Sequence, residues 1–150
     1  MWKDKLQEII QEKNLYGEKV NIGATESEIE LFPTETKTEL NVDLPIDYVK
    51  ILEYVNGLEF NGFILYGIDK DLLSMQPNQS INGLIEYNKI WYKNEWQKKY
   101  IFIGESNISW YVYDMVECRY LKLDNPSGRE NEVFSSLECM VEKLLSDALA

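Results

Sequence analysis

The stretch YIFIGESNISWYVYDMVECRYLKLD, residues 100–124, decides the fold class. It contains three runs dense in β-branched and aromatic residues, Tyr100–Gly104, Trp110–Met115 and Arg119–Asp124, joined by short segments. Such residues favour strands, and short connections join strands that run antiparallel. The stretch therefore predicts a three-stranded antiparallel meander.

A helix is expected after the meander, beyond a turn at residues 125–128. Ser135 and Glu138 have the spacing of a capping box, and Phe134 can pack against Cys139 across it. Apolar residues then recur at helical spacing: Leu137, Met140, Val141, Leu144, Leu145 and Ala148. The sequence predicts a closing helix capped at Ser135, with Cys139 facing inward.

Two helices are expected near the N-terminus. Apolar spacing predicts the first over residues 2–13. Thr25 and Glu28 form a capping box that begins the second. Pro33 should interrupt this helix because proline lacks an amide donor and clashes with the preceding turn. We expect the helix to resume over residues 34–40.

The middle of the chain predicts two further helices and a strand. Pro45 suits the first position of a third helix, which Asn56-Gly57 should end. Residues 63–68 are apolar and bounded by glycines, which is typical of a strand. A polar loop over residues 69–79 and a helix over residues 80–93 follow.

This order of elements predicts an α+β fold in a single domain covering residues 1–150. Helices segregate from an antiparallel sheet, for which we expect four to six strands with the helices packed against it. Cys118 and Cys139 have no metal-binding or redox spacing, so both are expected to be free thiols.

The chain is strongly acidic, with 26 acidic and 15 basic residues and a net charge of −11. Such a field disfavours nucleic acid and anionic membranes and attracts basic partners. Nine acids lie within residues 26–59, against Lys37 and Lys50. They are Glu26, Glu28, Glu30, Glu35, Glu39, Asp43, Asp47, Glu53 and Glu59. Two interpretations stay open, a solvated helical surface and a binding face for a basic protein.

The residues give no basis for catalysis. The chain has no histidine, which removes the commonest general base and metal ligand. Its abundant carboxylates form no catalytic or calcium-binding pattern, and no phosphate-binding glycine motif occurs. We therefore predict neither an enzyme nor a cofactor or metal site. The start of the chain is amphipathic and the apolar runs are short, which predicts a cytoplasmic protein without a membrane span.

Aromatic residues gather at Trp91, Tyr92 and Trp96, in a polar stretch near the end of an expected helix. An amphipathic lid over the core is the first interpretation. A contact with a partner, or self-association, is the second.

Several motifs, taken in order, resemble the SUKH superfamily of bacterial immunity proteins and yeast Smi/Knr cell-wall regulators. They are GATESEI at residues 23–29, LPIDY at 44–48, NG at 56–57, GFILY at 62–66, IGE at 103–105 and YVYD at 111–114. The resemblance covers residues 2–148. It implies a non-enzymatic protein that binds and neutralises a toxin, often a nuclease.

Residues and resemblance together favour inhibition of a cognate, basic toxin. The candidate binding residues are Glu26, Glu28, Glu35, Glu39, Asp43, Glu59, Trp91, Tyr92 and Trp96. Two alternatives stay open: a cellular adaptor or regulator with the same fold, and a module that binds a small ligand in an aromatic pocket.

Overall fold

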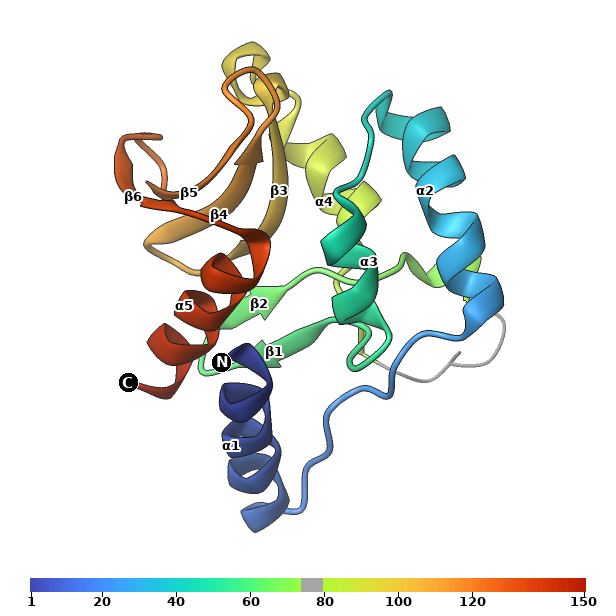
Figure 1. The fold of residues 1–150 in the computed structure, drawn as a ribbon, viewed down its shortest axis with the longest axis vertical. Coiled ribbons are helices and arrows are strands. Elements are labelled where there is room, and N and C mark those ends of the chain that lie inside the picture. The colour runs from blue at the N-terminus through green and yellow to red at the C-terminus, as the bar shows by residue number, and fades with distance from the viewer. Residues whose placement is uncertain (74–79) are drawn as a thin grey trace.

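A single antiparallel sheet organises the computed structural model, which describes residues 1–73 and 80–150. Its six strands lie side by side in chain order (Figure 1). They are β1 (Leu58–Phe60), β2 (Phe63–Leu65), β3 (Tyr100–Glu105), β4 (Ser109–Asp114), β5 (Arg119–Asp124) and β6 (Glu130–Phe134). The three strands predicted within residues 100–124 are confirmed as β3, β4 and β5.

Helices pack around this sheet. Within the described residues the α-helices are α1 (Trp2–Leu15), α2 (Glu26–Leu40), α3 (Ile46–Leu52), α4 (Leu84–Trp91) and α5 (Leu137–Leu149). Two 3₁₀ turns, η1 (Lys70–Leu72) and η2 (Glu95–Lys99), flank α4 in the chain. The prediction of an α+β fold with a four- to six-stranded, mainly antiparallel sheet is confirmed.

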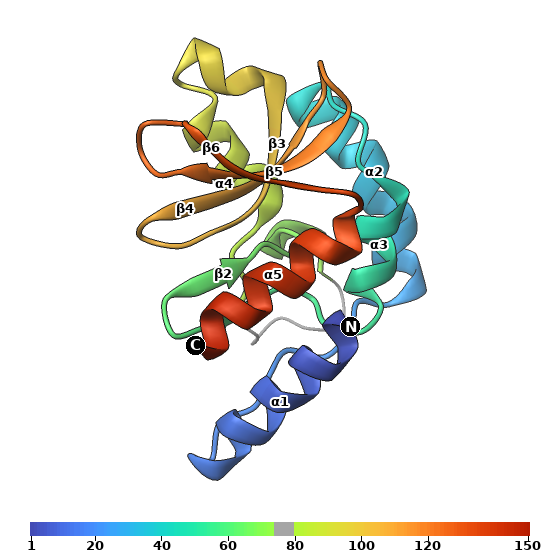
Figure 2. The same ribbon diagram turned by 60° about the vertical axis from the view of Figure 1, so that its left-hand side comes forward.

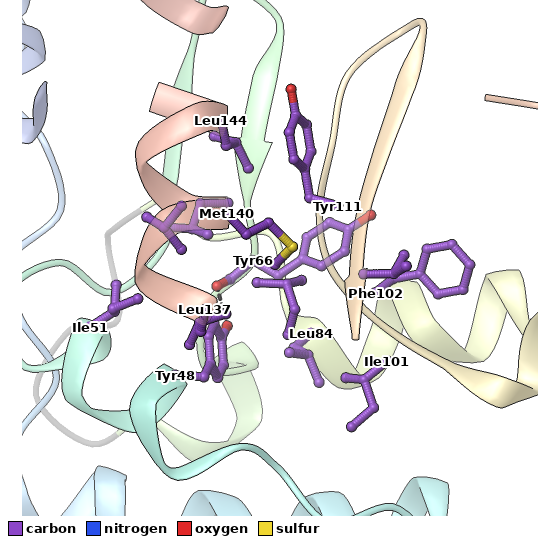
Figure 3. Packing of buried hydrophobic residues seen from close by; sticks show 14 of the residues in the cluster. Tyr48, Ile51, Tyr66, Leu84, Ile101, Phe102, Tyr111, Leu137, Met140 and Leu144 are labelled. Carbon is purple, nitrogen blue, oxygen red and sulfur yellow. Dashed lines mark hydrogen bonds between the residues drawn. The ribbon is translucent and has the colours of Figure 1, made fainter. Parts of the chain in front are cut away.

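The strand register separates the two faces of the sheet. Tyr111 of β4 pairs with Gly104 of β3 and with Lys122 of β5, and this row faces α5. Gly104 lets α5 approach closely, because an added Cβ would lie 2.6 Å from Leu144 Cδ1. Figure 3 shows Met140 and Leu144 of α5 facing Tyr111.

The opposite face of the sheet carries α4. Asn88 of this helix is fully buried, and its side chain bonds both backbone groups of Phe102, at 2.8 Å to the amide and 2.9 Å to the carbonyl oxygen. Phe102 and Trp110 form an edge-to-face ring pair beside it, with centroids 5.5 Å apart. Figure 2 shows α5 crossing the sheet on the side away from α4, with α1 packed beside it.

Three local predictions are wrong. The second helix runs through Pro33 without a break, and the neighbouring Phe32 is fully buried, so tertiary packing outweighs the missing hydrogen bond. The closing helix is capped by Ser136, one residue later than expected. Cys139 lies outside the buried stripe of this helix and is exposed instead of facing inward, and both cysteines are free thiols.

Other boundaries differ by smaller amounts. Pro45 caps α3 instead of occupying its first position, and α4 begins only after Gly83. Part of the loop expected at residues 69–79 forms η1, whereas residues 74–79 lie outside the described part. Within that part, no helix is long and apolar enough to cross a membrane.

Candidate partner-binding surface

An acidic groove of about 470 Å³ lies between α2, η1 and α4, and we call it the α2–α4 groove. Its lining residues are Glu35, Glu39, Asp69, Lys70, Asp71, Leu72, Ile85, Glu86 and Lys89. Five carboxylates and two ammonium groups give this surface a net charge of −3. Leu72 and Ile85 supply apolar contact area within it.

Asp69 fixes the geometry of this groove. Its carboxylate accepts hydrogen bonds from the amides of Ile85 at 3.0 Å and Glu86 at 2.8 Å, which are free donors in the first turn of α4. Burial raises the pKa of Asp69, and these amide bonds oppose the rise. The aspartate therefore joins η1 to α4 and adds charge to the floor of the groove.

Lys89 crosses the groove from α4 to α2. Its Nζ lies 2.6 Å from Glu39 Oε1, and the hydrogen bond to Glu39 raises the pKa of the lysine. Both side chains are about half exposed, so the ion pair contributes little to stability. A cationic group from a partner can compete with Lys89 for the same carboxylate.

The structure places the other predicted acids elsewhere. Glu26 is exposed in the first turn of α2, whereas Glu28 is 1% exposed and its Oε1 accepts the Thr25 amide proton at 2.8 Å. Asp43 lies beyond the end of α2. Glu59 is on β1, beside a separate cavity of about 600 Å³. Of the predicted acids, the structure brings Glu35 and Glu39 together in the α2–α4 groove.

The predicted aromatic residues have different environments. Trp91 Nε1 donates to the Tyr66 hydroxyl at 3.1 Å, and Tyr92 donates its hydroxyl proton to the Tyr100 carbonyl oxygen at 2.5 Å. Both contacts hold the end of α4 against the sheet. Trp96 is 46% exposed, and its ring lies so close to Gly128 that an added Cβ would clash with it. Trp96 is therefore the most accessible of the three.

Sequence reasoning missed Asp69, Asp71 and Glu86 as members of the acidic surface. Asp69 and Glu86 are 17 residues apart, and their proximity depends on how η1 meets α4. No local motif encodes that contact, although the short acidic pattern Asp69-Lys70-Asp71 is visible in the sequence.

Comparison with known families adds a second line of support. Residues 23–143 match the SMI1/KNR4 family, also called SUKH-1. The chain belongs to this family. Its members are commonly immunity proteins of polymorphic toxin systems and are generally non-catalytic. No curated protein matches the chain.

The structure explains several positions of the SUKH-1 resemblance. Tyr48 is fully buried and donates its hydroxyl proton to the Tyr66 carbonyl oxygen. Asn56 Oδ1 accepts the Ile68 amide proton at 2.8 Å, and Gly57 adopts a φ of 77° where a side chain would be strained. These contacts tie α3 to the strand region. In the LPIDY motif, by contrast, Ile46 is exposed.

Proposed function

We propose that this SUKH-1 chain is a non-enzymatic immunity protein that neutralises a cognate bacterial toxin through the α2–α4 groove. The observation that carries the proposal is the concentration of five carboxylates in one groove of a family member whose relatives commonly act as immunity proteins. A basic surface of the toxin, such as the one a nuclease uses to hold nucleic acid, is the complementary partner.

The charge of the whole chain supports rapid capture. A net charge of −11 attracts a basic protein over the screening length of the solution, and the groove then supplies short-range pairing. Steered association of this kind raises the on-rate far above that of a neutral pair. An inhibitor benefits because it must bind the toxin before damage occurs.

Growth rescue in a bacterial host tests the proposal. Each gene neighbouring the one for this chain is expressed alone and then together with this chain. We expect one neighbour to arrest growth and this chain to restore it, with a complex recovered from the rescued cells. Absence of any toxic neighbour, or growth arrest that this chain does not relieve, contradicts the proposal.

Charge variants test whether the groove is the binding surface. We expect Glu35→Gln/Glu39→Gln to reduce rescue and slow association with the toxin. Glu8→Gln/Glu138→Gln removes the same charge from exposed positions on α1 and α5 and is the matched control. Equal effects of the two double variants would show that the groove has no special role.

A further inference from the structure

A second cleft, of about 490 Å³, lies between the start of α3 and strands β4 and β5. We call it the tyrosine–aspartate cleft. Its lining includes Tyr113, Tyr120, Asp43, Asp47, Pro45 and Ile46. Among the described residues that line it, none has a cationic side chain. It lies on the same face of the sheet as α5. Tyr113 and Tyr120 are each two residues along their strands from the Tyr111–Lys122 pair, so their side chains share the face of that pair.

Two tyrosine rings form the wall of the cleft. Tyr113 and Tyr120 are directly paired across β4 and β5, with ring centroids 4.8 Å apart and an interplanar angle of 45°. Burial, followed by electrostatic effects of Tyr113 and Asp47, raises the pKa of Tyr120 to about 12, and burial also raises the pKa of Tyr113. Both phenols are therefore neutral near pH 7, and their ring faces are partly negative.

Two carboxylates from the α2–α3 connection and α3 complete the site. Asp43 pairs with Lys37 at 3.5 Å and Asp47 with Lys50 at 3.6 Å. All four side chains are about half exposed or more, so these long ion pairs are weak. A guest cation that also contacts the rings can displace both lysines at small cost.

The rim of the cleft is apolar. Ile46 is 77% exposed although it is a large aliphatic residue, and Pro45 precedes it. A long cationic side chain has an aliphatic stem that packs on such surfaces while its charged end reaches polar groups. The cleft therefore suits a long cationic side chain: the rings and the carboxylates can bind its charged end, and the apolar rim can pack against its stem.

We propose that the tyrosine–aspartate cleft receives one arginine or lysine side chain of the protein partner and anchors it. The guanidinium or ammonium group lies over the faces of Tyr113 and Tyr120 and pairs with Asp43 and Asp47, and its stem packs against Ile46. This inference rests on the proposed function for the identity of the partner. It assigns a role in holding the partner to residues outside the α2–α4 groove.

The chemical part is tested without the partner. Nα-acetyl-arginine amide is titrated into the protein carrying ring-labelled tyrosine, with the neutral isostere Nα-acetyl-citrulline amide as the comparison. We expect saturable NMR shifts of the Tyr113 and Tyr120 ring signals with the arginine probe and several-fold weaker shifts with citrulline. If the shifts caused by the arginine probe do not saturate up to about 50 mM, the affinity is far weaker than millimolar and the inference is wrong. Equal shifts with both probes would also contradict it.

Variants separate the contributions of charge and ring. Asp43→Asn/Asp47→Asn should abolish the response, whereas Glu8→Gln/Glu138→Gln, at exposed positions on α1 and α5, should leave it unchanged. Tyr120→Phe keeps a ring face and should bind the probe, whereas Tyr120→Leu should lose most of the binding. Probe binding that survives Asp43→Asn/Asp47→Asn, or that Tyr120→Leu leaves intact, contradicts the assignment.

Measurements with the toxin identified by growth rescue test the anchoring role. We expect Asp43→Asn/Asp47→Asn to increase Kd about tenfold, mainly through faster dissociation. Unchanged dissociation would reject the anchoring role while rescue by the wild-type chain still supports the proposed function. If no neighbour is toxic but the arginine probe binds, the proposed function fails and the selectivity of the cleft for a cationic side chain stands.

Discussion

At the scale of single residues, Asp147 is a charged group that connects three elements of the fold. Its carboxylate accepts hydrogen bonds from the Tyr111 hydroxyl at 2.6 Å and Lys122 Nζ at 2.9 Å, and Lys143 Nζ lies 3.3 Å away. Burial alone would raise its pKa, but these hydrogen bonds and the lysine charges lower it below the usual value. The aspartate therefore joins α5 to β4 and β5 as an ionised group.

We predict that Asp147→Asn lowers the free energy of unfolding by about 1–3 kcal/mol at pH 7, the usual range for a hydrogen-bonded charged group. A depressed folded-state pKa gives stability that is present above the unfolded pKa, near 3.9, and lost as pH falls through the folded pKa. Urea unfolding at pH 7 and near pH 2.5 should show a smaller difference between variant and wild type at the acidic pH. Asp71→Asn, at an exposed position, is the control. A difference that is constant across this pH range would contradict the ionised role.

The sequence pattern predicted which acidic residues line the site only where residues close in sequence are also close in space. Glu35 and Glu39 are four residues apart on α2, so a helix places them on one side, and both line the groove. Glu28 belongs to the same acidic run, yet its capping role buries it. Asp69 and Glu86 complete the groove through a tertiary contact that the linear sequence does not encode.

At the scale of elements, the beginning of α2 follows directly from the sequence. Thr25 Oγ1 accepts the Glu28 amide proton at 3.2 Å, and Glu28 Oε1 accepts the Thr25 amide proton at 2.8 Å. This reciprocal pair is the capping box that the spacing predicts. It satisfies amide donors that have no partner within the helix.

We predict that Thr25→Ala destabilises the protein by about 1 kcal/mol, because it removes the cap of α2. Thr38→Ala in the same helix is the matched control. Its hydroxyl donates to the Thr34 carbonyl oxygen at 3.0 Å on the exposed side, so its loss should change stability by less than about 0.5 kcal/mol. Thermal unfolding of both variants measures the difference. Equal losses would mean that the cap carries no special stabilisation.

Strands were predictable where β-forming residues are dense and were missed at the edges of the sheet. β1 has three residues and joins β2 through Asn61 and Gly62, both with positive φ, a two-residue hairpin turn that the Asn-Gly pair signals. β6 is an edge strand with four exposed residues and buries only Phe134, so no alternating pattern reveals it. The predicted start of the closing helix was one residue too early, because Ser135 and Ser136 are both serines and are equally suitable as N-caps.

At the scale of the whole molecule, we expect the excess of negative charge to guide the approach of a basic partner. The α2–α4 groove and the tyrosine–aspartate cleft are both acidic, and both flank the chain that runs from α2 into α3. Long-range attraction then acts on the rate of encounter, and the close contacts act on the lifetime of the complex.

We predict that association with the toxin slows strongly as salt is added, while dissociation changes less. The screening length is about 8 Å at physiological ionic strength and about 3 Å at 1 M, so salt removes the long-range attraction first. Stopped-flow association across a salt series measures this effect. An on-rate independent of salt would remove electrostatic steering as the means of capture.

From the order of strands in the sheet we expect an order in which the parts of the molecule fold. Residues 100–134 supply four neighbouring strands through short turns, so this part closes only small loops and can assemble early. The β1–β2 hairpin pairs with β3 only after residues 66–99 have brought the two together, and this long connection contains α4. The α2–α4 groove joins α4 to a helix that precedes both strands of this hairpin. We therefore expect the groove to form late in folding, and a partner bound there would stabilise the last contacts to form.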